Sequence, residues 1–402
     1  MRPQPPILNF PWHSAPRRWG HRLHSLCSYM AMFPPALPHF FIRWLTQPGQ
    51  VIYDPFSGRG TTLLEAGLLG RRGMGSDANP LAWILSSAKA QPCSLDELQA
   101  RIREIQRHRH KASTKSVPDH VRPLFSESVL SQLQSLKGQL NTRRKIDRFL
   151  LATLCGILHA NAKADGTPRG LTVAMPNTFA MAPGYVARYI EEHNLKPPEV
   201  NVLDALNTRL FDLDLPGQGL SCGKVWMQDA AVSGPWPAAM PHASLVFTSP
   251  PYLEVMKYGK LNWIRSWLIG EDPRVIDSRL FASASLPKYL DFTTRVLQRA
   301  RSKVKSNGWV CMVIGDVRRD SGDINLAEEV IKHCVPETDL RVVAVVADNL
   351  PIEHKVSRIW GATRGRATKT DRIIIMGGPR THDLPPIPSI DWGKTPALEA
   401  AT

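Results

Sequence analysis

A short polar turn follows the apolar run at residues 243–247, in the order Thr248-Ser249-Pro250-Pro251-Tyr252. Consecutive prolines lack backbone N–H donors and hold φ at a fixed value, so they cannot continue a central strand and predict a stiff, extended exit from it. A rigid turn at the carboxyl end of a strand would present the Ser249 hydroxyl, the Pro250 carbonyl and the Tyr252 ring to the crevice above a sheet. The turn is therefore a candidate site for chemistry that needs two oxygen acceptors and an aromatic ring.

A second candidate site is the glycine-bearing run at residues 54–62, Asp-Pro-Phe-Ser-Gly-Arg-Gly-Thr-Thr. Gly58 and Gly60 permit a tight turn and a close approach of the backbone to a ligand. The run is not a phosphate-binding Walker loop, because no Lys-Ser or Lys-Thr pair follows the last glycine. Thr62 and Leu63 stand where a dinucleotide fingerprint needs its third glycine. The turn therefore favours a nucleoside without a pyrophosphate, and an ordinary turn between strand and helix is the alternative.

The acidic residue Asp77 supports the nucleoside interpretation. It ends the run Gly73-Met74-Gly75-Ser76-Asp77, which we predict to be the next strand. An acid at this place can accept hydrogen bonds from ribose hydroxyls.

The helices and strands that must position these residues are predicted to form an α/β fold. Residues 50–55 predict a buried strand, residues 61–69 a helix and residues 73–77 a second strand, which is a βαβ start. A helical stretch at residues 24–46, broken near Phe33, Pro34 and Pro35, precedes it. Further strands are predicted at residues 224–227, 245–248, 309–314, 340–346 and 371–376.

The middle of the chain differs from both flanks. Residues 95–110, 126–140 and 147–162 have helical periodicity, and residues 163–170 form a polar loop. We therefore predict a helical insertion within a sheet. The expected domains are an N-terminal part at residues 1–94, the insertion at 95–200, a second part of the sheet at 201–377 and a flexible tail at 378–402.

Composition narrows the class of partner. The formal net charge of +15 and the pI near 9.8 favour polyanions such as nucleic acid. Residues 101–148 hold twelve Lys or Arg against four Asp or Glu, and a solvated basic helical face is the alternative explanation. No stretch reaches the roughly 18–20 apolar residues of a membrane span, and the start lacks a signal peptide, so we expect a cytoplasmic protein without a membrane partner. The six cysteines stand singly, which predicts neither a metal site nor a disulfide framework.

Taken together, the run at residues 54–62 and the turn at residues 248–252 resemble the S-adenosylmethionine-dependent amino-methyltransferases of DNA. Within that family, Ser-Pro-Pro-Tyr resembles the N4-cytosine branch, whereas adenine-N6 enzymes usually carry Asp or Asn before the prolines. The resemblance covers residues 23–85 and 225–376, and not the helical middle. It implies a Rossmann-like class I methyltransferase sheet, mostly parallel with one antiparallel strand, carrying a helical insertion. It also implies S-adenosylmethionine as cofactor, double-stranded DNA as substrate and, in a restriction–modification system, a cognate restriction endonuclease.

The resemblance also implies roles for single residues. Asp77 would hold the ribose, Asp229 and Ala230 would lie against the adenine, and Phe33 would belong to a cofactor-closing helix. The remaining cofactor-binding residues would be Asp54, Phe56, Ser57, Gly58, Gly60 and Thr61. The catalytic residues would be Ser249, Pro250, Pro251 and Tyr252.

The chemistry implied is the methylation of a weakly nucleophilic amine. The lone pair of an exocyclic base amine is delocalised into the ring, and two acceptors aimed at its N–H groups favour a tetrahedral nitrogen. Cytosine-C5 methylation would need a thiolate, and the one Pro-Cys pair, at Cys93, lies in a loop far from the second half of the sheet. The alternatives are an adenine-N6 DNA enzyme, an enzyme acting on a base amine of RNA, and a nucleic-acid-binding protein with a degenerate methylase fold.

In this family a target-recognition segment is often inserted between the halves, so residues 95–200 are the candidate for it. Phosphate contacts would come from basic residues of this segment, namely Arg101, Arg107, Arg143, Arg144 and Lys145. Arg169 could reach a base edge or a phosphate, and Lys257 could contact a phosphate or cap a helix. Each of these residues alone could instead be a solvated charge.

Overall fold

A computed structural model gives the fold of the chain, and it describes most of the 402 residues. The described residues are 7–8, 11–16, 18–30, 33–108, 110–159, 169–175, 181–232, 240–251, 253, 256–319, 322–349 and 367–398. Tyr252, one of the four expected catalytic residues, lies outside them.

One mixed sheet forms the centre of the molecule, with the strand order β1-β8-β9-β6-β5-β2-β3-β4 and β7 beside β6. The strands are β1 (Ile7–Leu8), β2 (Val51–Asp54), β3 (Arg72–Asp77), β4 (Gly223–Met227), β5 (Ala243–Thr248), β6 (Val304–Arg319), β7 (Gly322–Ile324), β8 (Arg341–Asn349) and β9 (Ala367–Gly377). Along this path only β9 runs antiparallel to its neighbours, β6 and β8. The expected mostly parallel, Rossmann-like sheet with one antiparallel strand is confirmed, and β7 adds a short antiparallel hairpin partner to β6.

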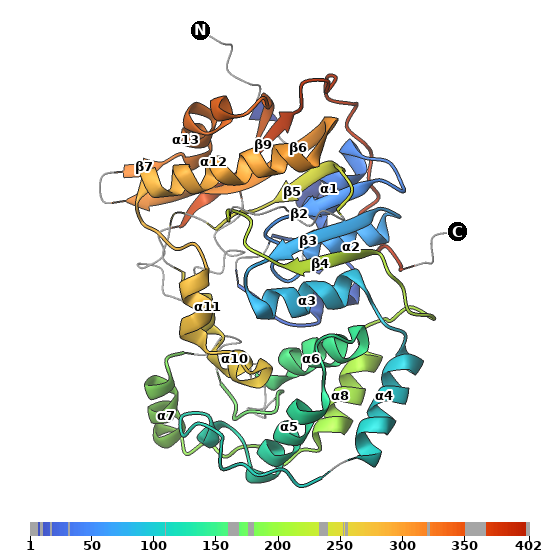
Figure 1. Cartoon of the computed structure of the whole chain (residues 1–402), viewed down its shortest axis with the longest axis vertical. Helices are drawn as coiled ribbons and strands as arrows, with labels where there is room; N and C mark the ends of the chain where they lie inside the picture. The colour runs from blue at the N-terminus through green and yellow to red at the C-terminus, as the bar shows by residue number, and fades with distance from the viewer. Residues whose placement is uncertain are drawn as a thin grey trace.

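The central strands are buried along their whole length because helices cover both faces of the sheet. Every residue of β2 and of β5 is buried. On one face β2 and β5 pack with the helices α12 (Leu286–Lys303) and α13 (Leu326–His333). On the other face they pack with α1 (Ala36–Leu45). Parallel strands buried on both faces are typical of α/β folds, and Figure 1 shows α12 crossing in front of the strands.

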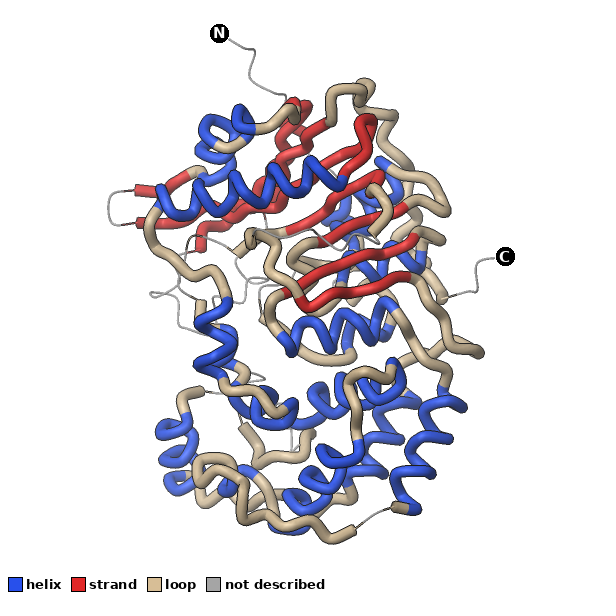
Figure 2. The backbone as a smooth tube through the Cα atoms, viewed as in Figure 1, coloured by secondary structure: helices blue, strands red, loops and turns tan. Residues whose placement is uncertain are grey.

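A separate helical cluster lies below the sheet in Figure 2. Its helices are α4 (Leu95–Arg107), α5 (Glu127–Gln139), α6 (Lys145–Leu158), α7 (Pro183–Glu192) and α8 (Val202–Phe211), joined by α10 (Trp263–Ile269). The helix α3 (Pro80–Ala90) connects this cluster to the sheet, because it packs against both β4 and α6. Ser94 and Glu97 form a capping box that starts α4 at the predicted residue.

The helical insertion ends later in the structure than residue 200. Leu203, Leu206 and Leu210 of α8 are buried in the same apolar cluster as α4 to α6. The chain returns to the sheet only at β4, which begins at Gly223.

Among the described residues, no helix is both long and apolar enough to cross a membrane.

The described part of the C-terminal segment is packed, which differs from the expected flexible tail. Trp392 is only 9% exposed and its ring meets that of Trp19 edge-on, with 4.9 Å between centroids. The indole Nε1 of Trp44 in α1 donates a hydrogen bond of 2.8 Å to the Pro385 carbonyl. The many prolines of this segment exclude helix and strand periodicity, so its apolar residues gave no recognisable pattern.

We expect Trp392→Ala to lower the free energy of unfolding by about 3 kcal/mol, because it removes a large buried aromatic side chain. Ile387, in the same segment, is 52% exposed and provides the matched control. Urea unfolding of Trp392→Ala and Ile387→Ala measures both effects. Equal stability of the two variants would contradict the packing described for the tail.

Candidate functional site

The two motifs meet at the point where the order of the strands reverses. β2 is parallel to β3 on one side and to β5 on the other, and Tyr53 pairs with Met74 and with Val246. The chain leaves β2 through the glycine loop toward β3, and returns to the other side of β2 as β5. In open α/β sheets, ligands bind in the crevice at the carboxyl ends of strands at such a switch point. The structure thus brings together two stretches that are far apart in the sequence.

The glycine loop has a backbone conformation that requires glycine. Gly58 has φ +50° and Gly60 has φ +80°, both in the left-handed region. A Cβ atom at Gly60 would lie 2.7 Å from Cα of Ser86 in α3, so the loop packs against that helix without room for a side chain. The Ser57 N–H donates a hydrogen bond of 2.9 Å to the Ser76 carbonyl. These contacts hold the loop between β3 and α3.

Three other side chains of this loop are directed into the protein. Ser57 is 4% exposed and its hydroxyl donates to Oγ of Ser86 at 3.2 Å. The half-buried ring of Phe56 packs against Phe292 of α12, at 5.9 Å between centroids. Thr61 is buried at the first turn of α2 (Thr61–Leu68). For these residues, a contribution to cofactor binding would come from the backbone.

Asp77, at the carboxyl end of β3, is the half-buried acid nearest the glycine loop. Its Oδ2 accepts a hydrogen bond from the Gly58 N–H and its Oδ1 accepts one from the Asn79 N–H, both at 2.9 Å. Burial raises the pKa of Asp77 to about 7; the two N–H donors oppose this shift, and the carboxylates of Asp54 and Asp229 add to it. Each oxygen retains acceptor capacity, so the carboxylate can bind a pair of vicinal hydroxyls.

Asp229 and Ala230, which the resemblance places against the adenine, lie beside Asp77 in the structure. The N–H of Gln228, just after β4, donates to the Asp77 carbonyl at 3.0 Å. Asp229 is half-buried and accepts a hydrogen bond of 2.8 Å from the Ala231 N–H, while Ala230 is 3% exposed. An acid for hydroxyls, an apolar wall and a glycine loop without a lysine form a donor set that suits an uncharged nucleoside group.

Asp54 is placed differently from the other expected cofactor-binding residues. It is 2% exposed, and its Oδ2 accepts a hydrogen bond of 2.7 Å from the Thr62 hydroxyl. Its Oδ1 accepts from the Thr248 hydroxyl at 2.7 Å and from the Phe56 N–H at 3.1 Å. Burial raises the pKa of Asp54 to about 6, although the three donors oppose the shift. The carboxylate therefore joins the glycine loop to the end of β5.

The turn after β5 begins at the mouth of the site. Thr248 is 1% exposed, whereas Ser249 is half-buried, Pro250 is buried and Pro251 is half-buried. Phe33, expected in a cofactor-closing helix, precedes α1 and its ring meets that of Phe247 edge-on at 5.6 Å. This contact attaches Phe33 to β5, one residue before Thr248.

Two tyrosines that were not predicted to bind the cofactor also border the site. The Tyr29 hydroxyl accepts a hydrogen bond of 2.9 Å from Nδ2 of Asn79, and a Cβ atom at Gly58 would lie 3.8 Å from the Tyr29 ring. The Tyr29 ring stacks on that of Tyr258, with 5.9 Å between centroids and 17° between planes. The sequence signal that could have indicated Tyr258 is its position shortly after the Ser-Pro-Pro-Tyr turn, next to Lys257. Tyr29 falls in the stretch 24–46 that was predicted to be helical, whereas residues 26–30 form neither helix nor strand in the structure.

The expected phosphate-binding residues of the insertion do not gather at the site. Arg101 is 8% exposed, and its Nε donates to Oδ1 of the fully buried Asp147 at 2.8 Å, so its guanidinium holds α4 to α6 and is not available to DNA. Arg107, Arg143, Arg144 and Lys145 are exposed. Three of them precede or begin α6, near the end of α3 that is remote from Asp77.

Two contacts establish the position of that end of α6. The guanidinium of Arg148 donates to Oε1 of Gln91, the residue after α3, at 3.0 Å, and Lys145 pairs with Glu97 at 3.5 Å. α3 starts next to Asp77 and has 11 residues, which corresponds to a length of about 16 Å. The start of α6 therefore lies at the amino edge of the sheet, away from the two motifs.

Arg169 and Lys257 are the expected nucleic-acid-binding residues at the carboxyl edge. Both are exposed. Lys257 directly precedes α9 (Tyr258–Leu261), whose first residue stacks on Tyr29. Arg169 follows the end of α6, where the Leu171 N–H donates to the Ile157 carbonyl at 3.0 Å. That end of α6 is the one that packs on residues 26–27, close to Tyr29.

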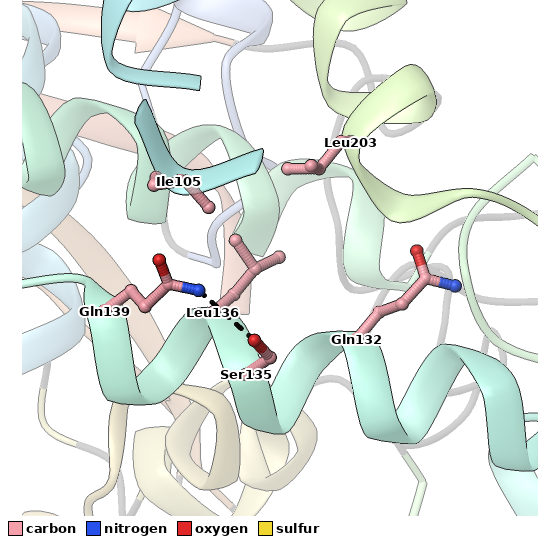
Figure 3. Close-up of a pocket in the computed structure, with 6 residues that line it drawn as sticks. All are labelled: Ile105, Gln132, Ser135, Leu136, Gln139 and Leu203. Carbon is pink, nitrogen blue, oxygen red and sulfur yellow. Dashed lines mark hydrogen bonds between the residues drawn. The ribbon is translucent and has the colours of Figure 1, made fainter. Parts of the chain in front are cut away.

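A small cavity occurs inside the helical cluster, between α4, α5 and α8. Figure 3 shows its lining, with Ser135 and Gln139 joined by a hydrogen bond of 3.2 Å. The lining residues are Ile105, Gln132, Ser135, Leu136, Gln139 and Leu203. The space is comparable to one water molecule, which is too small for a nucleoside.

Comparison with known proteins supports the resemblance drawn from the two motifs. Residues 11–83 match the family model described as DNA methylase, and this span includes the glycine loop and Asp77. The chain is 35% identical over 135 residues to the Type II methyltransferase M.MvaI of Kocuria varians, covering 30% of this chain and 29% of that protein. It is 24% identical over 141 residues to the Type II methyltransferase M.MjaII of Methanocaldococcus jannaschii, covering 35% and 26%. The matched region thus spans less than a third of either relative.

Among solved structures, TrmN from Thermus thermophilus aligns with 89% of this chain and 52% of its own, at 9% identity and a TM-score of 0.37. The match over residues 11–83 supports the resemblance to DNA amino-methyltransferases, whose cofactor is S-adenosylmethionine. The acid at Asp77 and the glycine loop fit its adenosine half.

We expect the affinity for S-adenosylmethionine to rise as the pH increases through about 7, the raised pKa of Asp77. If Asp77 holds the ribose, as the resemblance implies, its carboxylate accepts hydrogen bonds from both ribose hydroxyls above this pH, and the proton removes an acceptor below it. Below the pKa the affinity should fall by at most about tenfold per pH unit. Calorimetric titrations on both sides of this pKa measure the profile.

Asp77→Asn should bind more weakly and lose this pH dependence. Asp391→Asn is the matched control, because Asp391 is exposed in the C-terminal segment. If Asp77→Asn kept the wild-type profile, another group would be responsible for it.

Proposed function

We propose that this chain, which carries a domain of the DNA methylase family, methylates the exocyclic N4 amine of cytosine in DNA with S-adenosylmethionine as methyl donor. The observation that carries the proposal is the placement of the turn Ser249–Pro250–Pro251 directly beside the glycine loop, through the pairing of β2 with β5. The acceptors for an amine and the binding site for the cofactor thereby share one edge of the sheet.

The proposed roles follow from the chemistry of the amine. The Ser249 hydroxyl and the Pro250 carbonyl accept hydrogen bonds from the two N–H groups, which directs the nitrogen lone pair away from the ring. Bound S-adenosylmethionine supplies a methyl group that its sulfonium already activates. The protein therefore has to supply position and orientation, and the two prolines hold the acceptors without a rotamer cost.

Access to the base requires that it leave the duplex. The N4 amine is paired inside double-stranded DNA, so the cytosine must be flipped out, at a cost of a few kcal/mol of stacking and pairing energy. Tyr252, on the sequence pattern, is the ring on which the flipped base stacks. The similarity to two proteins named Type II methyltransferases supports a role in modification. A cognate restriction endonuclease is the partner that the resemblance implies.

Ser249→Ala should retain binding of S-adenosylmethionine and lose most methyl transfer, because it removes one acceptor; loss of one such group typically costs about 100- to 1,000-fold in kcat. The matched control is Ser244→Ala, since Ser244 is a buried serine at the opposite end of β5. Transfer of radiolabelled methyl groups to DNA measures both. Undiminished transfer by Ser249→Ala would exclude the role proposed for its hydroxyl.

The identity of the methylated base can be tested by sequencing DNA from cells that express the protein. The method must distinguish N4-methylcytosine from N6-methyladenine. We expect N4-methylcytosine at one sequence. Methylation confined to adenine would replace cytosine by adenine in the proposal while leaving the amine chemistry intact. The absence of any methylated base from this DNA, together with transfer of radiolabelled methyl groups to RNA, would exclude DNA as the substrate.

The two exposed basic residues at the carboxyl edge should contact DNA phosphates. Lys257→Ala and Arg169→Ala should each reduce the dependence of log Kd on log salt concentration by about 1, the change expected for one phosphate contact. Arg143→Ala and Arg144→Ala are the controls, because these residues lie at the amino edge. Salt titrations of binding to a duplex measure the slopes, and equal slopes for all four variants would contradict this placement of the DNA.

A further inference from the structure

We infer that Asp54 is a positioning residue that couples the cofactor loop to the catalytic turn, and that its carboxylate does not contact the cofactor. This inference rests on the proposed methyl transfer and adds to it a residue that acts through two others, Thr62 and Thr248.

The hydrogen bonds of Asp54 enclose its carboxylate within the protein. Asp54 is 2% exposed, and its two oxygens accept from the Thr62 hydroxyl, the Thr248 hydroxyl and the Phe56 N–H. A carboxylate has about four acceptor positions, of which three are used within the protein. A group so enclosed has no free face toward a ligand above the sheet.

The two hydroxyl donors to Asp54 come from the two halves of the site. Thr62 is the second residue of α2 and lies just after Gly60, so its hydroxyl fixes the end of the glycine loop. Thr248 is the last residue of β5 and directly precedes Ser249, so its hydroxyl fixes the start of the catalytic turn. The two threonines are both buried, at 1% exposure each. One carboxylate thus sets the separation between the two halves of the site.

The two prolines make the catalytic turn stiff, so a movement at its start reaches the catalytic groups. Because Pro250 and Pro251 have a fixed φ, a shift at Thr248 is passed on to the Ser249 hydroxyl and the Pro250 carbonyl and is not absorbed by the turn. A displacement of about 1 Å in a reacting geometry can reduce a rate by roughly 100-fold. Loss of the Thr248 bond should therefore affect the rate of transfer more than the binding of the cofactor.

The kinetic test uses Thr248→Val, which keeps the shape of the side chain and removes its hydroxyl. We expect kcat to fall by roughly 10- to 100-fold, with the Kd for S-adenosylmethionine changed by less than threefold in calorimetry. Thr248→Ser restores a hydroxyl donor and should recover most of kcat. The matched control is Thr153→Val, since Thr153 is a fully buried threonine of α6 that donates to its own helix at 2.9 Å; its kcat should equal that of the wild type.

A second readout does not depend on activity. Amide hydrogen exchange should show that Thr62→Val increases exchange at residues 247–249, although these residues are far from the substitution in the sequence. Conversely, Thr248→Val should increase exchange at residues 56–60. Thr153→Val should change neither segment, and thermal unfolding of each variant reports whether it is folded.

The inference is overturned if Thr62→Val leaves exchange at residues 247–249 unchanged. It is also overturned if Thr248→Val weakens cofactor binding as much as it lowers kcat, or if Thr248→Ser does not recover activity. Failure of the proposed function would look different: the wild type would transfer no methyl group to DNA, while the reciprocal change in hydrogen exchange would still be observed.

Discussion

The pairing of β2 with β5 is the interaction on which the rest of the site depends. Ile52 pairs with Leu245 and Tyr53 with Val246, and both strands are buried on both faces. Because a parallel ladder places equivalent ends of two strands at one edge, the glycine loop and the Ser-Pro-Pro turn must emerge side by side. The chain between α3 and β4 can then form the helical cluster of α4 to α8 without disturbing this pairing.

Buried polar contacts then hold the remaining walls of the site in place. Glu65 of α2 is fully buried, with Nε2 of His24 and Nδ1 of His39 at 2.6 and 2.7 Å from its two oxygens. Burial alone would raise the pKa of Glu65, but the hydrogen bonds from the two histidines outweigh it and lower the pKa. Breaking such a pair would leave a buried charge uncompensated, which is costly. The contacts thus hold the segment before α1, including Tyr29, against the glycine loop.

The basic residues of the described part of the chain lie on more than one face, so net charge alone does not indicate where the proposed DNA substrate would bind. Arg101 is used within the helical cluster, where it compensates the buried Asp147. The group at Arg143 to Lys145 lies at the amino edge, beyond the far end of α3. Only residues near the carboxyl edge, such as Lys257 and Arg169, lie on the side where a flipped base would enter. The net charge favours a polyanionic partner, and the direction of the strands indicates the face on which the proposed DNA would bind.

Much of the fold could be read from the sequence, because its signals are local. The runs that became β2, β3 and β5, the proline stop after Thr248 and the cap at Ser94 all depend on neighbouring residues. The packing of the Pro-rich segment around Trp392 could not be read, because its apolar residues have no period. The extension of the insertion through α8 was missed for another reason: its helix is recognisable only by what it packs against.

For the site, the sequence by itself determined the class of chemistry that we propose: a loop for a nucleoside without a pyrophosphate, an acid for ribose hydroxyls and a rigid pair of acceptors. Only the tertiary structure decided that Asp54 faces inward to Thr62 and Thr248, that Tyr29 lies against Gly58, and that the basic start of α6 lies away from the motifs. The physical reason is that residue types set which bonds a side chain can make. Which partner it finds depends on strands and helices that meet across the fold, such as two residues 194 positions apart.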